Sequence, residues 1–157
     1  MPSFETRRRV PFSPTEMFDL VADVERYPEF LPLCEGLRIL SQDGDGEQGS
    51  LVAAMDVGYK GIRETFTSRV QFDRSVPGVR TDLVQGPFNR LVNKWDFTPT
   101  PEGCEVKFFI DYEFKSMILQ MLVGSVFEQA FGRFSEAFEQ RAHDIYGQRG
   151  SRPDATT

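Results

Sequence analysis

The chain has 157 residues, a length that predicts one domain in which roughly 70% of the surface of the unfolded chain becomes buried. It carries 18 lysines and arginines against 24 aspartates and glutamates. The resulting net charge of -6 opposes a phosphate backbone and argues against DNA binding. Cys34 and Cys104 are too few for a disulfide framework, so we expect two reduced thiols.

Nothing in the sequence predicts secretion or a membrane span. Residues 1–10 lack the apolar core of a signal peptide. The longest uncharged apolar run, residues 117–127, falls short of the ~20 residues that a membrane helix requires. We therefore expect a soluble protein.

The chain begins with a predicted edge strand at residues 4–10, followed by two short helices. Ser13, with a proline after it, is a typical helix start. The helical pattern that follows is interrupted by Pro28 and Pro32. Proline removes a backbone donor and biases the preceding residue away from helical geometry. We call residues 21–34 the proline-broken segment.

Large apolar side chains crowd the proline-broken segment, among them Tyr27, Phe30 and Leu31. A compact core does not need such side chains on so short and bent a segment, whereas a lid over an apolar pocket does. The residues alone leave two interpretations open, a lid or an irregular piece of core.

Residues 37–114 predict about six consecutive antiparallel strands. Apolar runs at 37–40 and 51–57 flank a polar, glycine-rich loop at 42–49, and residues 98–103 predict a second turn. The last strand is the clearest, because apolar residues alternate with charged ones from Cys104 to Phe114. Such alternation indicates a sheet that is buried on one face only.

A long helix is predicted from about Met117 to Tyr146 and would span about 45 Å. Four phenylalanines recur on it at helical spacing, at 127, 131, 134 and 138, so their rings share one face. The tail 147–157 is polar, and we expect it to be disordered. The sequence thus predicts an α+β fold over residues 1–146, in which a curved antiparallel sheet of six to seven strands wraps around the C-terminal helix.

The parts that most enzymes need are missing from the sequence. His143 is the only histidine, and we expect it to be solvated near the end of the long helix. No GxSxG, HExxH, GxGxxG or Walker motif occurs, so no catalytic residue, metal or cofactor is predicted. Asp43–Gly46 (DGDG) lacks the terminal glutamate of a calcium loop and is interpreted as a hairpin turn.

Three polar residues share the inward register of the predicted strands: Glu64, Ser68 and Asn93. An unpaired carboxylate in an apolar interior is costly. Glu64 therefore either lies at a solvated rim or pairs with an arginine, or it joins Asn93 in binding the polar head of a ligand.

Three separated motifs carry a family resemblance. Residues 18–34 (FDLVADVERYPEFLPLC) closely resemble a signature of the coenzyme Q-binding proteins of the START superfamily, which also contains polyketide cyclase-like proteins. GPF-x-x-L-x-x-x-W-x-F at 86–97 and DYEFKS at 111–116 resemble the same family in the expected order. The likeness covers residues 3–146.

This resemblance implies a helix-grip fold that encloses an apolar tunnel, and a quinone or lipid chaperone rather than an enzyme. The ligand would be ubiquinone or a related polyprenyl lipid, with no other cofactor. The protein would support respiration or quinone synthesis in the bacterial cytoplasm, with transient contact to the inner membrane surface. The lid would consist of Tyr27, Phe30 and Leu31, and the tunnel would be lined by Phe66, Phe88, Trp95, Phe108, Phe127 and Phe131, with Glu64 and Asn93 as polar contacts.

The same family leaves two alternatives open. Its bacterial relatives include a ribosome-association toxin that binds the large ribosomal subunit and blocks subunit joining. Related helix-grip domains act as polyketide aromatases or cyclases, an activity for which the predicted strands lack a histidine.

Overall fold

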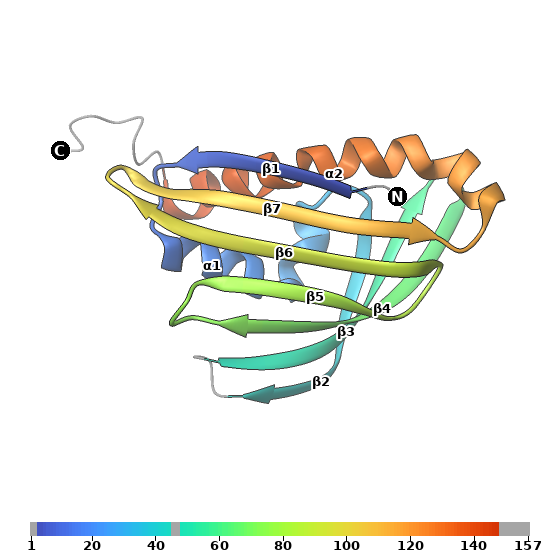
Figure 1. The fold of residues 1–157 in the computed structure, drawn as a ribbon, viewed down its shortest axis with the longest axis horizontal. Helices are drawn as coiled ribbons and strands as arrows, with labels where there is room; N and C mark the ends of the chain where they lie inside the picture. The colour runs from blue at the N-terminus through green and yellow to red at the C-terminus, as the bar shows by residue number, and fades with distance from the viewer. Residues whose placement is uncertain (1–2, 45–47, 148–157) are drawn as a thin grey trace.

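A seven-stranded antiparallel sheet with a long helix across one face makes up the computed structural model (Figure 1). The structure describes residues 3–44 and 48–147. The sheet order is β1-β7-β6-β5-β4-β3-β2. The strands are β1 (Ser3–Val10), β2 (Cys34–Gly44), β3 (Gln48–Tyr59), β4 (Ile62–Asp73), β5 (Gly78–Gln85), β6 (Phe88–Thr100) and β7 (Gly103–Phe114). The helices are α1 (Pro14–Ala22), the 3₁₀ helix η1 (Val24–Glu29) and α2 (Met117–Tyr146).

The predicted α+β class and the order of its elements are confirmed. In β7 every second residue is buried, from Cys104 to Phe114, as the alternation predicts. Ser13 caps α1 by accepting a hydrogen bond from the backbone N–H of Glu16. α2 has the predicted bounds and is capped by Ser116, whose hydroxyl accepts a hydrogen bond from the N–H of Leu119. No helix among residues 3–44 and 48–147 is both long and apolar enough to cross a bilayer.

The sheet curves toward α2 because its ladders contain bulges. Register shifts interrupt the pairing of β2 with β3, of β4 with β5 at Thr67/Ser68 and of β6 with β7 at Phe88/Arg90. A bulge bends the strand that carries it and increases its twist. In Figure 1, α2 runs along the face toward which the strands bend. The space between this face and α2 is where a ligand site can form.

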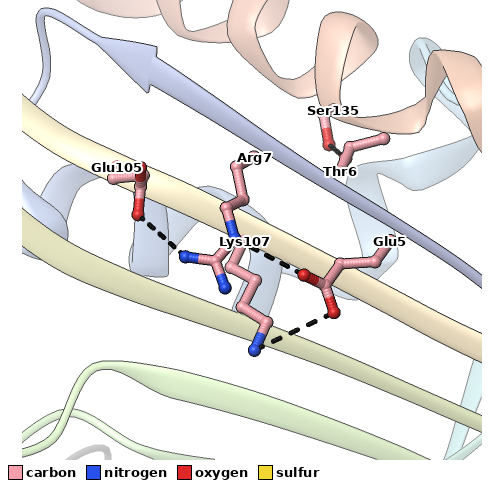
Figure 2. A network of polar contacts seen from close by, with 6 residues as sticks. All are labelled: Glu5, Thr6, Arg7, Glu105, Lys107 and Ser135. Atoms are coloured by element: carbon pink, nitrogen blue, oxygen red, sulfur yellow. Dashed lines mark hydrogen bonds and ion pairs between the residues drawn. The ribbon is translucent and has the colours of Figure 1, made fainter.

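β1 is an edge strand, as predicted, and it is fastened to α2. It pairs only with β7. The hydroxyl of Thr6 is hydrogen-bonded to the hydroxyl of Ser135 in α2, with the two oxygens 3.0 Å apart. Arg7 points to the opposite face, where it lies between Glu5 and Glu105 (Figure 2). The side chains of this strand therefore alternate between the helix and the outer surface.

Two predicted loops are shorter than their composition suggests. β2 runs on to Gly44 and β3 starts at Gln48, so most of the predicted loop 42–49 belongs to a paired hairpin, and only residues 45–47 lie outside the description. β6 continues through Pro99 to Thr100. Proline is tolerated there because the β5 ladder has already ended at Asp96. Of the predicted tail 147–157, only Gly147 lies within the described residues.

Candidate ligand cavity

An apolar cavity of about 90 Å³ lies between the sheet and α2. Among the described residues, no charged side chain, histidine or cysteine lines it. Such a lining favours the binding of an apolar molecule. Eight of the predicted binding residues line the cavity: Tyr27, Leu31, Phe66, Phe88, Asn93, Trp95, Phe127 and Phe131.

The wall on the helix side is aromatic. The four phenylalanines of α2 all line the cavity, which confirms that they share one face. Phe131 packs edge-on against Phe134, with ring centroids 5.3 Å apart, and Phe138 meets Trp95 of β6 at 4.9 Å. Edge-to-face contacts of this kind are favourable arrangements of aromatic rings, so the helix side of the cavity is a continuous aromatic wall.

The proline-broken segment closes one side of the cavity. Tyr27, Leu31, Pro32 and Leu33 all face inward. Burial raises the pKa of the Tyr27 phenol far above its ordinary value, and its hydroxyl donates to the backbone oxygen of Val21. The segment thus occupies the place that the lid interpretation assigns to it.

Leu33 has an unusual backbone conformation, with a φ of 69° in the left-handed region. This conformation is unfavourable by about 1–2 kcal/mol for a residue with a side chain such as leucine. Strain of this kind persists only where neighbouring contacts hold the residue in place. Leu33 is therefore a strained position of the proline-broken segment, held by the contacts around it.

Three predicted binding residues do not line the cavity. Phe30 is half-buried and packs against Phe138, with ring centroids 5.0 Å apart, but it does not line the cavity itself. Phe108 is fully buried, but the rings of Trp95 and Phe134 pack against it at 4.7 and 5.9 Å and separate it from the cavity. Glu64 lies near the start of α2, about 13 Å along β4 from the cavity-lining Ser68.

The polar groups of the cavity are few, and one of them has no partner. The Ser68 hydroxyl is buried and makes no hydrogen bond among the described residues. The amide nitrogen of Asn93 donates to the backbone oxygen of Phe109 at 2.9 Å, and Thr81 completes the polar lining. An unpaired buried hydroxyl is uncommon, and here it is available to a ligand. The inward register predicted Ser68, yet its importance as a polar contact was missed in favour of Glu64.

Other titratable groups lie away from the cavity. Burial raises the pKa of each cysteine thiol, Cys34 and Cys104, to about 11, and both are free. His143 is not solvated as predicted: its ring packs on Phe12 with centroids 5.0 Å apart, and its side chain is only 21% exposed. Within the described residues, no three His, Cys, Asp or Glu side chains gather as a metal site would require.

Comparison with known proteins gives the family. The family described as polyketide cyclase / dehydrase and lipid transport matches residues 10–139. The chain belongs to this family. The resemblance to the START superfamily that the motifs indicated is thereby confirmed.

Two named groups of relatives stand out. The ribosome association toxin RatA of Escherichia coli K12 is 39% identical over 150 residues, which cover 95% of this chain and 92% of the toxin. The mitochondrial coenzyme Q-binding protein COQ10 homolog B of Xenopus laevis is 32% identical over 143 residues, or 87% of this chain and 56% of that protein.

Solved structures share the fold. An 18 kDa protein of Caulobacter crescentus has a TM-score of 0.76 at 33% identity, over 94% of this chain and 100% of that one. The Zhui aromatase/cyclase of a Streptomyces species has a TM-score of 0.80, over 95% of this chain and 98% of that one. Because the cyclase is only 17% identical, this likeness shows the helix-grip fold alone.

Proposed function

We propose that this protein binds ubiquinone or a related isoprenoid lipid between the sheet and α2 and acts as a carrier for it, without catalysis. The observation that carries the proposal is the lining of the cavity, which combines aromatic walls with the buried Ser68 hydroxyl, for which the described residues offer no hydrogen-bond partner. A quinone ring is flat and apolar, and its carbonyls accept but do not donate hydrogen bonds. The similarity to a COQ10 protein supports the same ligand.

The chemistry of the lining favours binding over catalysis. A quinone carbonyl would accept a hydrogen bond from Ser68, while the ring would lie against the phenylalanines of α2. Each CH₂ group of an isoprenoid tail that leaves water would contribute about 0.8 kcal/mol. Proton transfer would need a group that titrates near neutral pH, and the described lining offers none.

The cavity is smaller than its proposed ligand. A volume of about 90 Å³ holds a few water molecules, since one water needs about 10–15 Å³ by the same measure. Binding of a whole quinone would therefore require the walls to separate, and side chains such as Phe131 or Tyr27 would have to move. In this proposal the protein works in the bacterial cytoplasm and meets the inner membrane to exchange its ligand.

Lipid extraction from the purified protein followed by mass spectrometry tests the proposal. We expect a quinone or polyprenyl lipid to be recovered, or to be taken up from detergent with quenching of Trp95, the only tryptophan of the chain. Glu64→Ala should leave uptake unchanged because Glu64 lies off the cavity, whereas Ser68→Ala should weaken it. Protein that never takes up such a lipid would overturn the proposal.

A ribosome-associated role is the second candidate, and the 39% identity to RatA over nearly its whole length favours it. Co-sedimentation with the large ribosomal subunit in sucrose gradients tests this role. A cavity variant such as Ser68→Ala should not affect it, because the ribosome would contact the surface of the protein. An aromatase or cyclase activity is supported by the description of the family and by likeness of fold, but the described lining of the cavity offers no group that titrates near neutral pH.

A further inference from the structure

Four large apolar side chains are exposed together at the start of α2. Met117, Ile118, Met121 and Leu122 are between 61% and 81% exposed, and we call them the α2 apolar patch. Their spacing places them on neighbouring positions of two successive helical turns. Figure 1 shows that these first turns of α2 form one end of the molecule. Clustered exposed apolar side chains of this size mark an interaction surface.

The charges around the α2 apolar patch are mostly positive, although the protein as a whole is acidic. No charged residue occurs between Lys115, which is exposed just before the patch, and Glu128. Lys60 and Arg63 are exposed on the β3–β4 hairpin, whose Tyr59 and Ile62 line a hollow together with Leu119 of α2.

The carboxylates nearest these cations are those of Glu35 and Glu64. Glu35 is 3.6 Å from the Arg63 guanidinium, so it is paired. Glu64 is half-buried and lines both the hollow beneath α2 and the surface hollow that Lys115, Ile118 and Leu122 also line. Lys60 and Lys115 thus remain as cations on the outer rim, beside apolar side chains, on a chain with a net charge of -6.

The α2 apolar patch also adjoins the cavity. Ile118, Leu119 and Leu122 line a surface hollow with Glu64 and Pro87. Leu119, Glu64 and Pro87 also line a narrow inner hollow of about 10 Å³, and Val57 and Phe127 are shared between that hollow and the cavity. A row of hollows therefore leads from the patch to the proposed ligand site.

We propose that the α2 apolar patch docks on a membrane surface that contains anionic lipids, and that an isoprenoid tail passes between the bilayer and the cavity at this end. The inference rests on the proposed function for its second part only. Exposed apolar side chains next to cations fit the boundary between acyl chains and anionic headgroups. The row of hollows marks a route for the apolar tail along which the walls would have to separate, because the inner hollow holds only about 10 Å³.

Flotation with lipid vesicles tests the docking without any quinone. Vesicles of phosphatidylcholine, with and without phosphatidylglycerol, are mixed with the wild type and with an Ile118→Ser/Leu122→Ser variant. The matched control is Leu40→Ser/Val84→Ser, which also removes two exposed apolar side chains. We expect the patch variant to lose on the order of tenfold in vesicle binding while the control binds like the wild type.

The charge contribution has its own pair of variants. Lys115→Glu should weaken binding to vesicles that contain phosphatidylglycerol and should have little effect on neutral vesicles, whereas Arg69→Glu, at an exposed position of β4, should change neither. Equal losses with both variants would indicate a general effect of net charge and would overturn the local docking surface.

The outcomes separate docking from ligand binding. The patch variant should still bind quinone from detergent, because the patch does not line the cavity, but should load more slowly from vesicles. Quinone binding without any flotation of the wild type would overturn the docking proposal alone, and flotation without quinone binding would overturn the proposed function alone. Docking on a membrane would also be overturned if the wild type dimerised, or co-sedimented with ribosomal subunits, and the patch variant did not. A second copy of the chain or a ribosome would then be the occupant of the patch.

Discussion

Replacing Ser68 with alanine should make the free protein more stable and a poorer binder of quinone. The Ser68 hydroxyl is buried and has no hydrogen-bond partner among the described residues, and leaving such a group unpaired costs about 1–3 kcal/mol. Ser68→Ala removes that cost, and it removes only one non-hydrogen atom, the hydroxyl oxygen. We therefore expect the free energy of unfolding to rise by about 1 kcal/mol, which raises Tm by about 2–4 °C in a domain of this size.

The effect on binding has the opposite sign. If the Ser68 hydroxyl donates to a quinone carbonyl, the variant loses a hydrogen bond with a net value of about 1 kcal/mol. This loss corresponds to a roughly fivefold higher Kd. Quenching of Trp95 fluorescence measures Kd, because Trp95 is the only tryptophan and lines the same cavity.

The matched control is Ser135→Ala. Ser135 is as buried as Ser68, but its hydroxyl is hydrogen-bonded to that of Thr6 at 3.0 Å (Figure 2). Ser135 does not line the cavity. Its removal should lower the free energy of unfolding by about 1 kcal/mol and leave Kd unchanged. If Ser68→Ala destabilised the protein as Ser135→Ala does, or bound quinone like the wild type, the assignment of Ser68 would be refuted.

Three further outcomes follow from the packing and the charges. Phe138→Ala should lower the free energy of unfolding in urea by about 3–5 kcal/mol, because a fully buried ring is lost from the aromatic cluster. The thiols of Cys34 and Cys104, with pKa values of about 11, should react with an alkylating reagent about 100-fold more slowly in the folded than in the unfolded protein. Arg90 donates hydrogen bonds to Asp111 and holds the pKa of that carboxyl below its usual value. The pair therefore stabilises the fold at pH values above the pKa that Asp111 has in the unfolded chain. This stabilisation is lost as the pH falls through the lower pKa that Asp111 has in the folded protein. Arg90→Gln should therefore be less stable than the wild type at neutral pH, and the difference should shrink in acid unfolding followed by circular dichroism.

The sequence predicts this fold well where one physical rule acts alone. Alternation along residues 104–114 leaves only one way to bury the apolar side chains, and β7 follows it. A serine cap and a turn of helix-compatible residues place the start of α2 at Met117. The predicted polar loop at 42–49 was too long, because residues 42–44 pair with residues 49–51 and so continue the two strands of the hairpin.

The candidate site was harder to predict because register gives the face of a strand but not the position along it. Glu64 and Ser68 point to the same side of β4, yet only Ser68 lines the cavity. Phe108 is likewise on the correct face but is covered by other rings. Which side chain covers which depends on where α2 crosses the sheet, and no local pattern contains that information.

The two ends of the cavity differ in what must break before a ligand can enter. At the proline-broken segment, Tyr27 is hydrogen-bonded to Val21, and Phe30 is held beneath the Arg141 guanidinium at 5.0 Å. At the start of α2, Leu119 and Phe127 line the inner hollow through apolar contacts that lipid can replace, and Glu64 is the one charged side chain among the described residues of that hollow. Entry beside α2 would therefore separate mainly apolar contacts but would pass the Glu64 carboxylate, whereas the family resemblance favours the proline-broken lid.

Leu119→Trp distinguishes the two routes, because a larger side chain would fill the hollow between the α2 apolar patch and the cavity. If the ligand enters beside α2, this variant should take up quinone from vesicles several-fold more slowly while Ser68 still sets the final affinity. A Tyr27→Ser/Phe30→Ser variant would instead be the slower one if the proline-broken segment opens. Equal rates of uptake for Leu119→Trp and the wild type would exclude the path beside α2, and the proline-broken segment would then be the entrance.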